Sequence, residues 1–81
     1  MRHLPLLSEA AKSLLPGALY EHFKGNRYKL LYIARHSETL EELVVYQALY
    51  DGSIWVRPLQ MFIEKVSVDG VLIPRFKHVH D

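Results

Sequence analysis

The dipeptide Asp-Gly occurs twice in this chain, at Asp51-Gly52 and at Asp69-Gly70, each time between segments in which apolar and polar residues alternate. Both central residues of a type I′ turn need a positive φ, and Asp-Gly is one of the pairs that adopt this turn most readily. Each pair therefore predicts a β-hairpin with a two-residue turn. In the second hairpin this register places Glu64 opposite Arg75 as a cross-strand ion pair.

Short alternating segments separated by turn residues extend this pattern over most of the chain. The expected strands are residues 19–24, 28–36, 43–50, 54–57, 66–68 and 71–76. Pro58 cannot donate a ladder hydrogen bond, so the fourth strand ends there or lies at a sheet edge. Such strands in a chain of 81 residues favour a mainly β fold, a small SH3-like β-barrel of five or six short antiparallel strands.

The first 16 residues depart from this pattern and predict a short N-terminal helix. Ser8 is a suitable N-cap, Glu9 lies in the first turn where the helix dipole favours a carboxylate, and Pro16-Gly17 ends the helix. We expect residues 1–16 to form an N-terminal extension and residues 17–76 to form the barrel domain. Residues 77–81 are polar and are expected to be a flexible tail.

Composition and charge argue against several classes of function. A formal charge of +1 gives no basic face of the kind that nucleic-acid-binding domains carry. The chain has no cysteine, and no apolar stretch approaches the roughly 20 residues of a membrane span. His78 and His80 are too near the end of the chain to form a strong metal chelator. We therefore expect a cytoplasmic protein with no metal, no cofactor and no membrane association.

The first Asp-Gly hairpin should separate its side chains onto two unlike faces. A two-residue turn places Tyr46 opposite Arg57 and Ala48 opposite Trp55. The face expected to join the core carries Leu43, Val45, Gln47, Leu49, Ile54 and Val56. The other face concentrates tyrosine, tryptophan and arginine, the residue types enriched at binding hot spots, namely Tyr46, Tyr50, Trp55 and Arg57. The helix or the returning chain could cover these aromatic side chains or leave a cleft.

A polar segment lies at residues 35–42, where a strand gives way to a loop. Arg35 and His36 could donate hydrogen bonds to an anionic group, and Glu38 could orient the imidazole. His36 and Ser37 would point to opposite sides of a strand, which argues against a nucleophile pair. The alternative interpretation is a solvated loop whose hydroxyl groups bond the neighbouring backbone.

Five segments together resemble a family of small bacterial domains of unknown function. They are residues 20–28 (YEHFKGNRY), 33–41 (IARHSETLE), 44–50 (VVYQALY), 55–62 (WVRPLQMF) and 74–76 (PRF). The resemblance spans residues 17–76 and implies a compact SH3-like barrel from a bacterium, without an established activity. It also implies that the family's pattern includes Arg35, His36, Ser37, Glu38, Glu41, Tyr46, Gln47, Trp55 and Arg57.

The leading hypothesis is a non-enzymatic binding module for a polar or anionic ligand or a peptide. Its ligand-binding residues would be Arg35, His36, Glu38, Tyr46, Gln47, Trp55 and Arg57. One alternative is a hydrolase-like acid–base enzyme that uses His36 with Glu38 or Glu41. A second is a nucleic-acid or nucleotide binder that uses Lys24, Arg27, Lys29, Arg35 and Arg57. The partner could be a small ligand or another protein, and the aromatic face could also form a homodimer.

Overall fold

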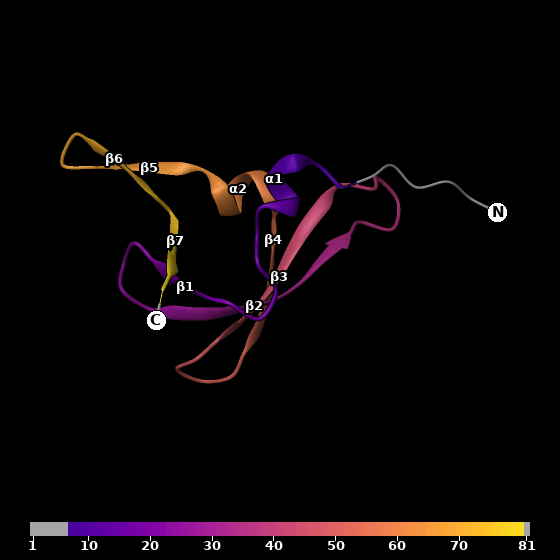
Figure 1. Cartoon of the computed structure of the whole chain (residues 1–81), viewed down its shortest axis with the longest axis horizontal. Helices are drawn as coiled ribbons and strands as arrows, with labels where there is room; N and C mark the ends of the chain where they lie inside the picture. The colour runs from indigo at the N-terminus through magenta and orange to yellow at the C-terminus, as the bar shows by residue number, and fades with distance from the viewer. Residues whose placement is uncertain (1–6, 81) are drawn as a thin grey trace.

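The computed structural model describes residues 7–80 as an antiparallel sheet with a separate two-stranded ribbon and two short helices (Figure 1). The elements are α1 (Glu9–Lys12), β1 (Leu19–His22), β2 (Arg27–Arg35), β3 (Glu42–Ala48), β4 (Ile54–Pro58), α2 (Leu59–Ile63), β5 (Lys65–Val68), β6 (Val71–Pro74) and β7 (Phe76–Val79). The main sheet has five strands in the order β4-β3-β2-β1-β7, and β5 pairs with β6. The mainly β class predicted from the sequence is confirmed. No helix within the described range is long and apolar enough to cross a membrane.

The two end strands of the main sheet, β4 and β7, are not paired with each other within residues 7–80. The described strands therefore form an open sheet, and closure into the expected SH3-like barrel is not observed. Residues 77–79, which were expected to be a flexible tail, instead belong to β7 and pair with β1. Phe76 is buried and the His78 ring packs on Tyr20 at 5.3 Å between centroids, so this segment is held by packing.

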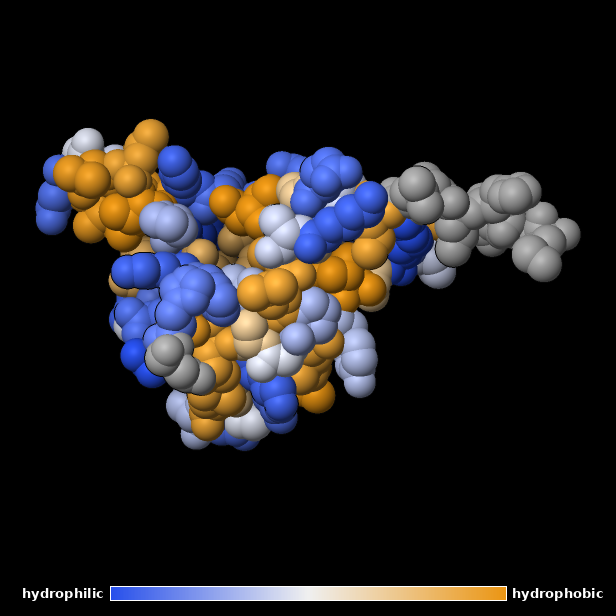
Figure 2. Space-filling model, in the orientation of Figure 1, coloured by the Kyte–Doolittle hydropathy of each residue, from blue (hydrophilic) through white to orange (hydrophobic). Residues whose placement is uncertain are grey.

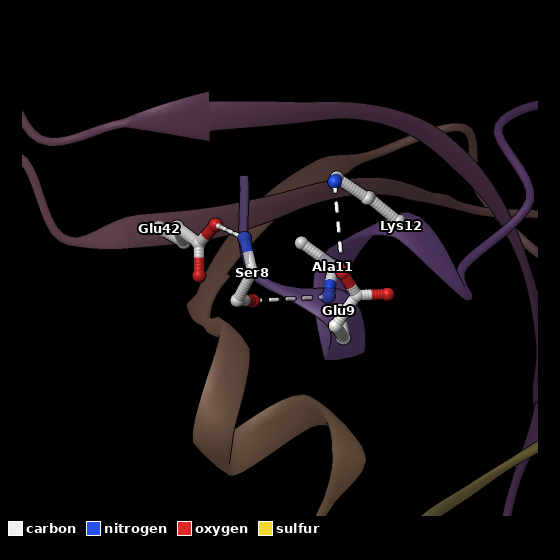
Figure 3. Close-up of polar contacts among 5 residues, drawn as sticks. All are labelled: Ser8, Glu9, Ala11, Lys12 and Glu42. Carbon is white, nitrogen blue, oxygen red and sulfur yellow. Dashed lines mark hydrogen bonds and ion pairs between the residues drawn. The ribbon is translucent and has the colours of Figure 1, made fainter. Parts of the chain in front are cut away.

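The helix α1 begins as predicted, with Ser8 as its N-cap, but ends at Lys12. The Ser8 hydroxyl accepts a hydrogen bond from the backbone N–H of Ala11 at 3.1 Å. The backbone N–H of Ser8 itself donates to Oε2 of Glu42 at 2.7 Å (Figure 3). Because Glu42 begins β3, this bond ties the N-terminal extension to the sheet. Residues 1–6 of the predicted extension lie outside the described residues.

The second Asp-Gly hairpin has the predicted type I′ turn. Asp69 and Gly70 both have a positive φ, of 51° and 79°, and the strands pair in the expected register. Arg75 donates to Oε1 of Glu64 at 2.8 Å, which confirms the predicted ion pair. The ribbon formed by β5 and β6 extends to one side of the sheet (Figure 1). Next to its turn, the apolar side chains of Val68, Val71 and Leu72 are exposed, and this end of the molecule is largely hydrophobic in Figure 2.

The register of the first Asp-Gly hairpin was predicted wrongly by two residues. Tyr46 lies opposite Trp55 rather than opposite Arg57. The carboxylate of Asp51 accepts the backbone N–H and the hydroxyl of Ser53, at 2.9 and 2.6 Å, and Asp51 does not adopt a positive φ. A type I′ turn at residues 51–52 therefore cannot form. A four-residue loop, 49–52, replaces it and is closed by a hydrogen bond from the N–H of residue 48 to the carbonyl of residue 53.

The prediction of which hairpin face joins the core was also wrong. A shift of two residues leaves each side chain on its expected face, but Val44, Tyr46 and Ala48 are buried while Ile54 and Val56 are more than half exposed. We call the buried side the inner face; it carries Tyr28, Leu30, Val44, Tyr46, Ala48, Trp55 and Arg57. The outer face carries Lys29, Tyr32, Val45, Gln47, Ile54 and Val56.

The inner face becomes the core because two distant segments return across it. Phe62 of α2 stacks on Phe76 of β7, with ring centroids 4.2 Å apart and planes 7° apart. Both rings also lie edge-on to Tyr46, at 5.6 and 5.5 Å. The strand pattern around residues 43–57 contains no information about these contacts, which explains the wrong assignment.

Candidate functional site

A hollow of about 220 Å³ lies on the inner face where the covering segments stop. Its lining is Tyr28 from β2, Tyr46 from β3, Trp55 and Arg57 from β4, and Tyr50 from the loop between β3 and β4. Trp55 and Arg57 share the face because side chains alternate along a strand. Tyr46 is only 5% exposed whereas Trp55 is 51% exposed, so the cover of the aromatic face is partial.

Tyr28 contacts both of the other tyrosines of the hollow edge to face. The ring of Tyr28 lies 5.3 Å from that of Tyr46 and 6.2 Å from that of Tyr50, with planes close to perpendicular. Burial raises the pKa of Tyr28 above its usual value, and its hydrogen bond with Tyr50 raises it further. The Tyr28 hydroxyl therefore stays neutral at physiological pH, and its ring forms an uncharged wall of the hollow.

Arg57 supplies the charge of the hollow. Its Nε donates to the Tyr46 hydroxyl at 3.3 Å, and its guanidinium carbon lies 5.7 Å from the centroid of the Phe76 ring. The lining contains no carboxylate, and no ion pair joins Arg57 to an acidic residue among residues 7–80. Burial lowers the pKa of His22, and the charge of Arg57 lowers it further; the same charge counteracts part of the increase in the pKa of Tyr28. The hollow is therefore electropositive.

A chain of hydrogen bonds orients the indole of Trp55. Its Nε1–H donates to the hydroxyl of Ser53 at 2.7 Å, and that hydroxyl donates to Asp51. The loop that replaces the predicted two-residue turn thus also positions one wall of the hollow. A preoriented ring loses less conformational entropy when a ligand contacts it.

The structure brings three of the seven predicted ligand-binding residues together and places the other four elsewhere. Tyr46, Trp55 and Arg57 line the hollow. The outer-face residue Gln47 instead donates from Nε2 to the carbonyl of Gly52 at 3.0 Å and supports the loop. Arg35, His36 and Glu38 lie at the opposite end of the β2–β3 pair, where Arg35 faces Glu42 across the sheet.

The imidazole of His36 organises its own loop. Its Nδ1 accepts backbone N–H bonds from Glu38 at 3.1 Å and from Thr39 at 3.3 Å, and the Thr39 hydroxyl accepts the N–H of Glu41. His36, Glu38 and Glu41 are all exposed, which is the arrangement of a solvated loop. The acid–base alternative requires these side chains to converge in a cleft. They line neither the hollow around Arg57 nor the two hollows around β1 and β7.

The basic residues of the nucleic-acid alternative lie on different faces. Lys29 is on the outer face and Arg57 on the inner face. Arg27 is paired with Glu21 at 3.0 Å. A nucleic-acid backbone needs one contiguous basic surface, which these positions do not provide.

Two larger hollows lie around β1 and β7. They measure about 330 and 390 Å³, and Glu21 and Lys77 line both. Glu21 is already engaged by Arg27, whereas the smaller hollow contains a cation with no acidic partner in its lining. No three His, Asp or Glu side chains in the described part of the chain gather closely enough to hold a metal ion.

Two residues of the hollow, Tyr28 and Tyr50, were not among the predicted ligand-binding residues. Tyr50 was placed on the correct face by alternation alone. Tyr28 could be placed on this face only from the pairing of β2 with β3, in which it lies opposite Ala48.

The fold and the hollow define a class of protein: a small domain with one open antiparallel sheet that presents an arginine among aromatic rings. The family model described as protein of unknown function (DUF1653) matches residues 18–78, so the chain belongs to this family. The chain is also similar to the crystal structure of a DUF1653 protein from Bordetella bronchiseptica, with 36% sequence identity and a TM-score of 0.76. That match covers 85% of this chain and 91% of the other. No curated protein matches the sequence significantly.

Proposed function

We propose that this domain is a non-enzymatic binding module that holds an anionic group attached to a planar ring in the hollow around Arg57. The observation that carries the proposal is the guanidinium of Arg57, which Tyr46 and Phe76 position beside four aromatic rings and no carboxylate. A guanidinium binds carboxylate or phosphate through parallel N–H bonds. Aromatic rings pack against a planar group and exclude water from it.

The size of the hollow restricts the ligand. Its volume of about 220 Å³ is below the roughly 300–1,000 Å³ of typical small-molecule sites. The hollow can therefore receive one ring with one anionic group, or one side chain, but not a dinucleotide. A carboxylate and a phosphate are the two anionic groups that match the arginine.

Tryptophan fluorescence provides the test, because Trp55 is the only tryptophan in the chain and forms a wall of the hollow. Phenyl phosphate, N-acetylphenylalanine and adenosine monophosphate serve as probes that combine a ring with an anion. A saturable change in emission is expected with at least one of them. If none changes the emission of Trp55 up to millimolar concentration, the proposal fails.

Two arginine variants show whether the charge of Arg57 is responsible. Arg57→Gln removes a charge-assisted hydrogen bond of about 1.5–3 kcal/mol and should weaken binding roughly 10- to 100-fold. Arg27→Gln is the matched control, since Arg27 pairs with Glu21 and does not line this hollow. Equal losses of affinity in the two variants would mean that net charge, not the site, attracts the anion.

A further inference from the structure

The edge strand β4 presents an unusual surface for the edge of a sheet. It lies at one end of the five-stranded sheet, and among the described strands it pairs with β3 alone. Three consecutive apolar side chains are largely exposed on it: Ile54 at 62%, Trp55 at 51% and Val56 at 59%. An edge with this composition is a template for pairing with another strand.

The direction of the free backbone groups of β4 follows from its pairing. The N–H of Ala48 donates to the carbonyl of Ser53 at 2.8 Å, so Ser53 directs its backbone groups toward β3. In an antiparallel pair this direction alternates along the strand, and Trp55 therefore also faces β3. Ile54 and Val56 consequently direct their N–H and C=O groups away from the sheet, where an added strand would meet them.

The opposite edge of the sheet differs from β4. The edge strand β7 carries the exposed, charged side chain of Lys77, and the side chain of its first residue, Phe76, is buried. Charged side chains are one of the devices by which proteins prevent edge-to-edge association. Residues 54–56 contain neither a charge nor a proline, and Pro58 stands only at the end of the strand.

We propose that β4 pairs with an extended peptide that presents a carboxylate to Arg57. The inference rests on the proposed function, because the same hollow receives the carboxylate. Trp55 and Arg57 line the hollow while the alternating residues Ile54 and Val56 offer the backbone ladder. In strand addition of this kind, backbone hydrogen bonds supply affinity and a pocket for one side chain supplies specificity.

The charge and the size of this surface favour a peptide over a second copy of the chain. Arg57 is the only charged residue of β4, so a symmetric pairing would bring in a second arginine and no acid. The strand has only five residues. A stable dimer buries roughly 800 Å² per partner, which is far more surface than a five-residue strand provides. The carboxylate can come from an acidic side chain or from a peptide C terminus.

The experiment uses phage-displayed random heptapeptides, one library with a free C terminus and one flanked at both ends. Peptides are selected on the wild-type domain and measured against Arg57→Gln and Val56→Pro. The proline removes an N–H that makes no ladder bond within the described sheet, so the fold should tolerate it. Selected peptides should bind each variant at least tenfold more weakly, and the enriched library shows which carboxylate is recognised.

Amide hydrogen exchange in the wild-type complex tests the same claim without a substitution. Exchange at Ile54 and Val56 should slow at least tenfold when a selected peptide binds. The inference is overturned if those amides are unaffected, or if sedimentation shows a dimer that protects them without peptide. If no peptide is enriched while N-acetylphenylalanine still changes Trp55 emission, this inference fails and the proposed function stands. If neither probe binds, both fail.

Discussion

Leu40 and Gly52 occupy the same position in two hairpin loops that share one pattern of backbone hydrogen bonds. In the β2–β3 loop the N–H of Leu40 donates to the carbonyl of His36, and in the β3–β4 loop the N–H of Gly52 donates to the carbonyl of Ala48. Each residue is the last of four in its loop and has a positive φ, 64° for Leu40 and 76° for Gly52. One loop therefore carries backbone strain that the other avoids, because left-handed backbone is costly for residues other than glycine.

Substitutions at these two positions should change stability in opposite directions. Gly52→Ala should lower the free energy of unfolding by about 1 kcal/mol. The added Cβ would meet only Nε2 of Gln47, at 3.8 Å, so the cost comes from the backbone. Leu40→Gly should raise the free energy of unfolding by up to about 1 kcal/mol, less what the partly buried side chain contributes. Urea denaturation measures the stability of both variants, and equal midpoints for the two would contradict the prediction.

Removal of the central aromatic ring should unfold the domain or nearly so. Phe62 is 1% exposed and stacks on Phe76, so Phe62→Ala should cost about 3–5 kcal/mol. That loss is close to the whole free energy of unfolding at the lower end of the roughly 5–15 kcal/mol of folded domains, where so small a domain lies. Ile63→Ala, on the same helix at 36% exposure, is the control and should cost much less. Thermal unfolding, monitored by circular dichroism, compares the two variants. Similar midpoints would show that Phe62 is not central to the core.

The sequence predicted those elements whose causes are local. The type I′ turn at Asp69-Gly70, the N-cap at Ser8 and the end of β4 at Pro58 all follow from the conformational limits of those residues. The turn at Asp51 was mispredicted because the Asp51 carboxylate accepts hydrogen bonds from the backbone N–H and the hydroxyl of Ser53.

Features that depend on distant contacts could not be predicted. The inner face is buried by Phe62 and Phe76, which lie far along the chain from Tyr46. Alternation did group Tyr46, Trp55 and Arg57 on one face, and the structure brings these three together. Tyr28 was missed as a site residue because its place depends on the pairing of β2 with β3, where it lies opposite Ala48.

The stability of the domain should fall as the pH drops below about 6.5. Burial lowers the pKa of His22 below its usual value of 6.5, and the charges of Arg57, Arg75 and Lys24 lower it further. The unfolded chain then binds a proton more readily than the folded one, so stability is present above pH 6.5 and is lost as the pH falls toward the lower folded value. His22→Gln should flatten this dependence in urea titrations from pH 7.5 to 5. An unchanged slope would exclude His22 as the cause.

The contact between Glu42 and Ser8 should hold the N-terminal helix on the sheet (Figure 3). The hydrogen bond from the Ser8 N–H lowers the pKa of Glu42, so the contact stabilises the fold above the usual glutamate range and is lost as the pH falls from that range to the lower pKa of the folded state. Glu42→Gln should speed amide exchange at Ser8 and Ala11, and Glu41→Gln should leave it unchanged. The same exchange rates in both variants would show that α1 is held by packing alone.

Arg57 and its aromatic neighbours are proposed to form a binding site for an anionic group. Two-dimensional NMR during titration with N-acetylphenylalanine and phenyl phosphate tests it most directly, because the indole N–H of the single tryptophan and the Nε–H of Arg57 report from the site itself. Both signals should shift saturably, and in Arg57→Gln the Trp55 shift should require roughly 10- to 100-fold more ligand. Shifts confined to the hollows around Lys77, or none at all, would contradict it.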